Sequence, residues 1–364
     1  MKYINCSSPA GGVSSPTCLS TVPGRWSDQG SCALQGLSEG SGRQANDRRE
    51  SGDRHEKTEN VKSPGHGKIR RRWICGGTGK AQGRTCNDHK QINTGEVIFM
   101  NIGFGFYPGG KRKALTMSYD DGQVHDRKLV EIFNRYGIRG TFHLNSGRFD
   151  TDVFLKSTEI RDLFEGHEIS AHTLNHPYLT ILPGDMVATE VLEDRKNLEE
   201  LAGYPVRGMS YPFGAYSQEL VEILPFLGIE YCRTVNSHFG FQLPDDFLAW
   251  HPTCHHKQGL MEKAEAFRKI GKWAQMPLLY VWGHSFEFEW DKNWDLIEEF
   301  CKTVSGDEDV WYATNIEIAD YVKAMKSLKF SVDRKTVHNP SAQDVWISVD
   351  GEPCRIEAGK TVRL

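Results

Sequence analysis

From about Glu96 onward, short apolar runs alternate with amphipathic segments, and this alternation constrains the fold more than any other feature of the chain. The runs have the length and composition of buried strands, whereas the segments between them carry apolar residues at helical spacing. Strands and helices that alternate in this way form a parallel sheet, either open or closed into a barrel. In both arrangements a functional site is expected at the carboxyl ends of the strands.

The positions of the expected elements follow from these patterns. The predicted strands cover residues 114–119, 140–144, 168–171, 206–211, 229–235, 278–282 and 310–314. The predicted helices cover residues 124–136, 158–165, 185–202, 218–227, 260–274, 293–304 and 316–326. Gly137, Gly166 and Gly203 follow three of these helices, as glycine commonly does at a helix end.

The two ends of the chain differ from this central part. Residues 1–95 carry 15 Lys and Arg against 8 Asp and Glu, have few aliphatic side chains and show no periodicity. We expect them to form a disordered, basic, low-complexity segment. In residues 327–364, two apolar runs flank the dipeptide Asp350-Gly351, which predicts a short antiparallel β appendage packed on the main domain. The domain between them is predicted to span residues 96–326.

Charge and hydropathy exclude several classes of partner. The chain as a whole carries a net charge of -4, and the run Arg70–Arg72 is interpreted as a solvated segment, so nucleic acid is not expected to bind. No apolar run approaches the roughly 20 residues that span a membrane, and the first residues lack a secretory signal. We expect a cytoplasmic protein, with secretion left open if the natural chain starts elsewhere. The nine cysteines include no CxxC pair, so neither a disulfide framework nor a zinc knuckle is predicted.

Two carboxylates stand at the first predicted strand end. Asp120 and Asp121 directly follow the strand over residues 114–119, and Gly122 comes next. At a junction between strand and turn, both carboxylates can face one site, where one can bind a metal while the other stays free as a base. A solvated turn is the structural alternative, because Asp-Gly is common in turns.

Two histidines follow another strand. His172 and His176 come after the strand over residues 168–171, and we interpret their spacing as one helical turn that places the rings about 5–6 Å apart. Such a pair suits two imidazole ligands of a zinc-like ion, and Asp121 would complete a two-histidine, one-carboxylate set. A surface turn is the alternative for the histidines alone. Their occurrence with an aspartate pair at strand ends of one domain favours a metal site.

Two further segments follow strands. Pro212 and Gly214 fix a turn in which the Phe213 N–H is free to donate, and a backbone donor near a metal can stabilise an oxyanion. His284 follows the strand over residues 278–282, where it is well placed as a general acid. An ordinary β–α turn and a buried structural histidine are the respective alternatives.

In this order the segments TMSYDDG, HTLNHP and YPFG, and the apolar strand before His284, resemble the motifs of the NodB-type polysaccharide deacetylases, carbohydrate esterase family four. The resemblance covers roughly residues 111–325, and its most specific part is DDG followed about 50 residues later by HxxxHP. It implies a distorted (β/α) barrel with fewer than eight regular units. It also implies hydrolysis of an acetyl group from an N-acetyl hexosamine or an O-acetyl sugar within an oligo- or polysaccharide.

The resemblance further implies a role for each site residue. Asp120 would be the catalytic base, His284 the acid, and the Phe213 N–H the oxyanion donor. The implied ligands of one divalent metal, zinc with cobalt or nickel as alternatives, are Asp121, His172 and His176. The oligomeric state is not implied.

The chain departs from the family pattern at two places. Ser210 stands where the family often has an arginine that orients the base, so Arg233 or Arg207 is expected to replace it. The usual aspartate-tryptophan motif is not recognisable, and Trp250 stands in that region. The residues expected to contact substrate or oxyanion are Tyr211, Phe213, Arg233 and Trp250. The neighbouring His255 and His256 are interpreted as loop residues rather than extra ligands.

Two other classes of function remain open. A metal-dependent amidohydrolase on a barrel usually begins with HxH on its first strand, whereas this strand ends in Asp-Asp. A catalytically weak or inactive carbohydrate-binding protein on the same fold should lack its base or acid, and both Asp120 and His284 are present.

Overall fold

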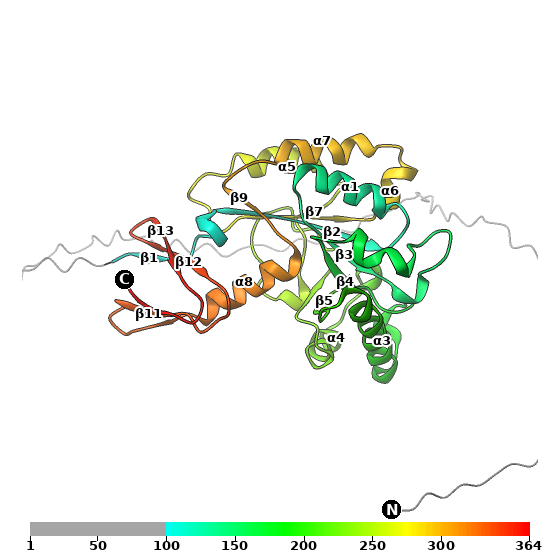
Figure 1. The fold of residues 1–364 in the computed structure, drawn as a ribbon, viewed down its shortest axis with the longest axis horizontal. Helices are drawn as coiled ribbons and strands as arrows, with labels where there is room; N and C mark the ends of the chain where they lie inside the picture. The colour runs from blue at the N-terminus through cyan, green and yellow to red at the C-terminus, as the bar shows by residue number, and fades with distance from the viewer. Residues whose placement is uncertain (1–99) are drawn as a thin grey trace, which may run out of the picture. The chain divides into compact units, whose positions relative to one another are not determined.

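A computed structural model describes residues 100–364 of the 364-residue chain (Figure 1). The expectations for residues 1–95 lie outside the described residues. Within residues 100–364, no helix combines the length and the apolar character that crossing a membrane requires.

A parallel sheet forms the centre of the fold. Its strands are β2 (Lys113–Asp121), β3 (Gly140–Leu144), β4 (Glu168–Ala171), β5 (Gly208–Ser210), β6 (Tyr231–Arg233), β7 (Cys254–His255), β8 (Leu278–Gly283) and β9 (Val310–Tyr312). The order across the sheet is β6-β5-β4-β3-β2-β8-β7. The nine-residue strand β2 is central: β8 pairs along one side, and on the other side β9 pairs with its first residues and β3 with its last.

The segment from Trp250 to His255 joins the two ends of this sheet. The Trp250 N–H donates to the Cys232 carbonyl of β6 over 3.0 Å, and Cys254 pairs in parallel with Val281 of β8. The sheet is therefore closed into an irregular barrel. This arrangement confirms the predicted distorted (β/α) barrel with fewer than eight regular units.

Helices cover the outside of the strands. They are α1 (Asp126–Tyr136), α2 (Ile160–Leu163), α3 (Gly184–Ala202), α4 (Gln218–Ile223), α5 (Leu260–Arg268), α6 (Ser285–Trp290), α7 (Trp294–Val304) and α8 (Asn315–Ser327). In Figure 1, α1, α5 and α7 lie together on one side of the strands, and α3, α4 and α8 lie on the other. Helix α1 shows why the helices pack on the strands. Its side chains Leu129, Ile132 and Phe133 are buried, and burial of each contributes about 1.5–3 kcal/mol to the stability of the fold.

The C-terminal region forms two small antiparallel sheets. One contains β1 (Ile102–Gly103), β12 (Val345–Val349) and β13 (Glu352–Ile356), and the other contains β10 (Lys329–Phe330), β11 (Thr336–His338) and β14 (Thr361–Arg363). The predicted hairpin at Asp350-Gly351 is β12–β13, and both turn residues have positive φ. The appendage packs through apolar side chains onto α8. Because β1 precedes the barrel, the appendage also uses residues from before the predicted boundary at 327.

Some elements differ from the sequence expectation. Strand β6 has only three residues, and α5 ends at Arg268 rather than at residue 274, shortly before Gly271. Helix α6 was not predicted, because its sequence SFEFEW alternates like a strand. It begins as a helix because Glu287 accepts the backbone N–H of His284 over 3.1 Å, as in a capping box.

Candidate active site

The expected base, acid and metal ligands, together with Tyr211 and Phe213, meet at the carboxyl ends of the barrel strands. They surround a cavity of about 470 Å³. Its lining consists of Asp120, Asp121, His172, His176, Tyr211, Phe213, Gly214, Val235, Trp282 and His284.

The two aspartates reach this cavity because the chain turns at the end of β2. Successive side chains of a regular strand point to opposite faces. Asp121 has φ of 82° and Gly122 has φ of 70°, so the backbone leaves the strand conformation where the second carboxylate begins. Both carboxylates therefore face the same site, although Asp120 is only 3% exposed.

The two histidines lie on an irregular loop, so the predicted helical turn is wrong. Thr173 and His176 have φ of 70° and 60°, which no α-helix contains. Buried side chains hold this loop instead: the Asn145 amide donates to the His172 carbonyl over 2.6 Å, and Asp194 accepts the His172 N–H over 3.0 Å. Neither Asn145 nor Asp194 was singled out from the sequence, since both come from distant segments.

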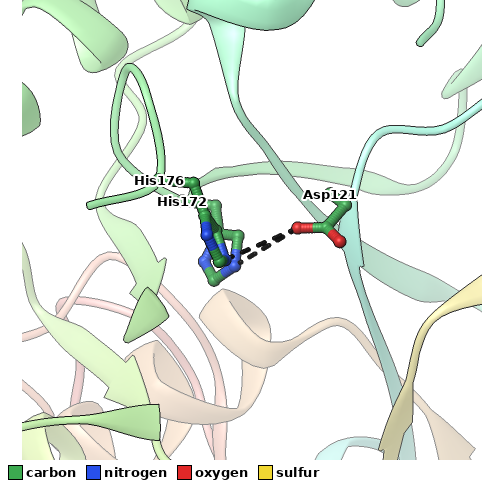
Figure 2. A group of neighbouring side chains, drawn as sticks. All are labelled: Asp121, His172 and His176. Atoms are coloured by element: carbon green, nitrogen blue, oxygen red, sulfur yellow. Dashed lines mark ion pairs between the residues drawn. The ribbon is translucent and has the colours of Figure 1, made fainter. Parts of the chain in front are cut away.

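Asp121 and the two imidazoles converge as metal ligands would (Figure 2). Asp121 Oδ1 lies 3.7 Å from His172 Nε2 and 3.6 Å from His176 Nε2. Ligands about 2.0–2.1 Å from a tetrahedral zinc would be roughly 3.3 Å apart, so a small closure would complete the set. Asp121 Oδ1 is also buried without a hydrogen-bond partner among the described residues. An unpaired buried carboxylate oxygen between two imidazoles fits a divalent metal.

The protonation of His172 suits a ligand. Its Nδ1 donates to the Ser210 carbonyl over 2.9 Å, which leaves the Nε2 lone pair facing Asp121. Burial lowers the pKa of both His172 and His176, so both rings are neutral at physiological pH. Burial raises the pKa of Asp121 because it disfavours the ionised carboxylate, and a bound cation would stabilise the ionised form.

Asp120 lies in a different environment from its neighbour. Its Oδ2 is bonded to Arg233, and its Oδ1 accepts from the Ser210 hydroxyl over 3.3 Å. Burial alone would raise the pKa of Asp120, but the Arg233 guanidinium, aided by nearby histidines, holds it well below its usual value. Arg207, the other expected replacement for the missing arginine, instead pairs with Asp320 on the outside of the barrel.

The turn after β5 presents a backbone donor and an aromatic ring. Phe213 has φ of 58°, and the N–H groups of Gly214 and Ala215 close the turn onto the carbonyls of Tyr211 and Pro212. The Phe213 side chain is 51% exposed beside His176. Tyr211 lines the cavity with its buried ring, while its hydroxyl donates to the Leu248 carbonyl.

His284 is held across the cavity by Glu287. The imidazole Nδ1 lies 3.2 Å from Glu287 Oε2. The other ring nitrogen, Nε2, is therefore not engaged by Glu287. Burial would lower the pKa of His284, but this hydrogen bond and the charges of Asp120 and Asp121 raise it. A histidine with a raised pKa is suited to donating a proton. Glu287 was not singled out from the sequence, and its i+3 spacing from His284 at a helix start is the signal that could have found it.

A second group with metal-ligand spacing contains His255, His256 and Glu287. The Lys257 N–H donates to His255 Nδ1 over 3.1 Å, so the ring proton sits on Nε2, which lies 3.0 Å from Glu287 Oε2. A protonated nitrogen cannot bind a metal. The Lys257 ammonium, 3.2 Å from Glu287 Oε1, adds a positive charge. This group is therefore a hydrogen-bonded support for Glu287.

The expected contact of Trp250 with substrate is wrong. Its side chain is 1% exposed and packs between Tyr231, Phe247 and Tyr280 in the core. Its position in the chain resembled that of a motif residue, but the segment around it is the one that closes the barrel and therefore turns the ring inward.

The fold is that of a β/α-barrel protein, and its strand ends bring two histidines and one carboxylate close enough together to hold a metal ion. Residues 108–232 match the model of the polysaccharide deacetylase family. A peptidoglycan-N-acetylglucosamine deacetylase of Listeria monocytogenes is 26% identical over 113 residues, which cover 30% of this chain and 23% of that protein. A chitooligosaccharide deacetylase of Azorhizobium caulinodans is 27% identical over 121 residues, 32% of this chain and 56% of that protein.

Among solved structures, a family 4 carbohydrate esterase from Streptomyces lividans is similar with a TM-score of 0.39 and 13% identity, over 55% of this chain and 91% of that one. Over residues 108–232 the chain is therefore similar to the polysaccharide deacetylase family, in agreement with the resemblance of its motifs to the NodB-type enzymes. The matched part of this chain spans about a quarter of the length of the peptidoglycan-N-acetylglucosamine deacetylases to which it is similar. The matched region contains Asp120, the three candidate ligands and Phe213, but ends before Arg233 and His284.

Proposed function

We propose that this protein is a metal-dependent hydrolase that removes acetyl groups from an acetylated carbohydrate. The observation that carries the proposal is the contrast between two adjacent carboxylates. Asp120 is ion-paired with Arg233, whereas Asp121 faces two neutral imidazoles, and His284 lies across the same cavity. Neighbouring carboxyl groups with different environments are suited to different tasks.

Asp121, His172 and His176 would hold one divalent ion, and zinc suits this mixture of nitrogen and oxygen ligands, with cobalt or nickel as alternatives. When bound, such an ion supplies Lewis-acid polarisation and lowers the pKa of water. The side chains and the backbone around the ion would transfer the protons and stabilise the oxyanion.

Asp120 would act as the base. The Arg233 guanidinium keeps it ionised at neutral pH, and the Ser210 hydroxyl orients its other oxygen. An ionised carboxylate fixed at both oxygens can accept a proton from a water molecule in the cavity. Oxygen charge that develops on the acetyl carbonyl would lie near the Phe213 N–H.

His284 would act as the acid. Its raised pKa keeps the ring protonated over a wider pH range, and Glu287 fixes the ring so that Nε2 can face the leaving group. The proton from His284 would convert a departing amine or alkoxide into a neutral product.

The named relatives favour an amide substrate. The proteins from Listeria monocytogenes and Azorhizobium caulinodans are named as deacetylases of N-acetylglucosamine in peptidoglycan and of chitooligosaccharides. We therefore propose an N-acetyl hexosamine as the preferred substrate, with O-acetyl sugars as the second candidate. Amines are poor leaving groups, so a dedicated acid such as His284 is consistent with this choice.

Acetate release tests the proposal. The purified protein, loaded with zinc, would be incubated with chitooligosaccharides, peptidoglycan fragments, acetylated xylan and an aryl acetate. We expect release from at least one glycan, and none after removal of the metal. Tight glycan binding with no release from any substrate would instead support the carbohydrate-binding alternative.

A further inference from the structure

Buried polar side chains fill the inside of the barrel between the candidate active site and the amino ends of the strands. They share a face of the sheet with Asp120, because His143 is its direct partner in β3 and Ser170 is in turn the partner of His143 in β4. The buried polar side chains on β2, β3 and β4 are Thr116, Ser118, Thr141, His143, Glu168 and Ser170. Barrel interiors are commonly filled by branched apolar side chains, so this polar interior calls for an explanation other than packing.

Glu168 of β4 is the centre of one hydrogen-bond network in this interior. Its Oε1 accepts from the Tyr231 hydroxyl over 2.7 Å, and its Oε2 accepts from the Thr141 hydroxyl and the Ile316 N–H, each over 2.9 Å. The Ser170 hydroxyl lies 3.1 Å from the Tyr231 oxygen and donates to it, because the Tyr231 proton is used by Glu168. One buried carboxylate thus ties β4 to β3, to β6 and to the first turn of α8.

The Tyr231 ring reaches Glu168 by crossing Gly208. Tyr231 of β6 and Gly208 of β5 are direct partners in the parallel pairing of these strands. A Cβ atom at position 208 would overlap the Tyr231 ring. Any other residue at this position would push the ring aside, so the missing side chain of Gly208 is what lets the Tyr231 hydroxyl enter the barrel.

The same short strand carries Arg233. Strand β6 has three residues, and Tyr231 and Arg233, two positions apart, point to the same face of the sheet. Besides Asp120, the Arg233 guanidinium contacts the Trp282 ring and donates to the Thr234 carbonyl over a long 3.4 Å. Its Nε is buried and has no hydrogen-bond partner within residues 100–364. Few contacts of its own fix the guanidinium, so its position depends on where β6 lies.

We infer that Tyr231 and Glu168 are positioning residues for the proposed base Asp120. By anchoring the inner side of β6 to β3, β4 and α8, they place the Arg233 guanidinium against the Asp120 carboxylate. Neither Tyr231 nor Glu168 lines the cavity, so both act through Arg233 and not on the substrate. The inference rests on the proposed function for the role of Asp120 as base.

A double-mutant cycle between Tyr231→Phe and Arg233→Met tests this role. Tyr231→Phe removes only the hydroxyl that bonds Glu168. Both single variants and the double variant would be compared with the wild-type protein in kcat and KM for hydrolysis of an aryl acetate. Tyr107→Phe is the matched control, because the buried Tyr107 hydroxyl donates over a similar 2.8 Å to the Met276 carbonyl and takes no part in the network of Glu168.

Tyr231→Phe should lower kcat about tenfold and change KM less than about twofold, because a misplaced ion pair weakens the base without altering substrate binding. In the Arg233→Met protein the same change should lower kcat less than about twofold, since no guanidinium is left to position. Metal content and the Tyr107→Phe control should match the wild-type protein. Equal losses in both backgrounds, no loss in the wild-type background, or an equally large loss in Tyr107→Phe would overturn the inference.

Glu168→Gln tests the other member of the pair. It keeps the size of the side chain but replaces one accepting oxygen with a donor, so its loss of kcat should show the same dependence on Arg233. A folded Glu168→Gln variant with unchanged kcat would overturn the assignment of Glu168. If this variant does not fold, Tyr231→Phe, which removes a single oxygen atom, decides the inference alone.

Failure of the proposed function would be seen separately. If the wild-type protein hydrolysed no acetyl substrate, the proteins of the cycle would be compared in urea unfolding, which requires no activity. Tyr231→Phe should then raise the unfolding equilibrium constant at least about threefold more in the wild-type background than in the Arg233→Met background. Equal increases in the two backgrounds would show that Tyr231 does not act through Arg233 and would overturn the inference.

Discussion

Replacing Arg233 with methionine tests the assignment of Asp120 as base. Arg233 is fully buried, Asp120 is 3% exposed, and the two side chains are directly bonded. Methionine keeps an unbranched side chain but removes the positive charge. The Asp120 carboxylate would therefore lose its ion-pair partner while staying shielded from water.

The size of the effect follows from this burial. Removing one partner of a buried ion pair costs about 3–5 kcal/mol. Because one pKa unit corresponds to about 1.4 kcal/mol, the pKa of Asp120 should rise by roughly 2–4 units. A base works only when ionised, so activity is lost as pH falls through its pKa. The acid limb of the pH profile of kcat/KM should therefore move upward by about the same amount.

Stability should change with pH in a matching way. In the wild-type protein the pKa of Asp120 lies below its unfolded value of 3.8, so the ion pair stabilises the fold above that value. This contribution is lost as pH falls through the folded pKa. The difference in unfolding free energy between the wild-type protein and Arg233→Met should thus be largest at neutral pH and decrease below a pH of about 4.

The assays are aryl acetate hydrolysis across pH and urea unfolding at fixed metal concentration. Arg233→Lys keeps the charge but loses the planar contact with the Trp282 ring, 4.4 Å away, and should be intermediate. The double variant Arg233→Met with Asp120→Asn should regain most of the stability while remaining inactive. An Arg233→Met variant with an unmoved acid limb and unchanged unfolding free energy would refute the assigned pair.

The remaining predictions concern the metal and the proton donors. Elemental analysis should find near-stoichiometric metal, most of which His172→Ala loses and His255→Ala keeps; full retention in His172→Ala would reject the ligand set. Asp120→Asn should keep its metal but lose activity at least about a hundredfold, measured as acetate release. His284→Ala should slow amides much more than aryl acetates, since good leaving groups need little protonation, and equal losses would count against this acid. In Glu287→Gln the pKa of His284 should fall, so the basic limb of the pH profile of activity should move to lower pH. An unmoved basic limb would contradict this.

The sequence predicted the convergence of the main candidate residues for a topological reason. In a parallel barrel all strands end at one rim, so Asp121 at the end of β2 and His172 after β4 had to approach each other. The alternation of strands and helices was enough for this step. It did not require knowledge of the loops.

The details that depend on distant contacts could not be predicted. The spacing of His172 and His176 indicated a helical turn, but Asn145 and Asp194 bind the loop backbone in a conformation with positive φ. The assignment of Trp250 failed for a similar reason. Its burial follows from closure of the barrel by a segment with almost no strand signal, which periodicity does not reveal.

Strand register explains how Arg233 comes to stand beside Asp120 when Ser210 occupies the position of the usual family arginine. Ser210 of β5 and Arg233 of β6 are direct partners in the parallel pairing of these strands. Partners in neighbouring strands point to the same face of a sheet, so either position can send a long side chain toward the end of β2. The small Ser210 leaves room for the guanidinium and adds its own hydroxyl to Asp120. The positive charge beside the proposed base is therefore a property of the site that two adjacent strands can supply, and its loss from one position does not by itself indicate loss of function.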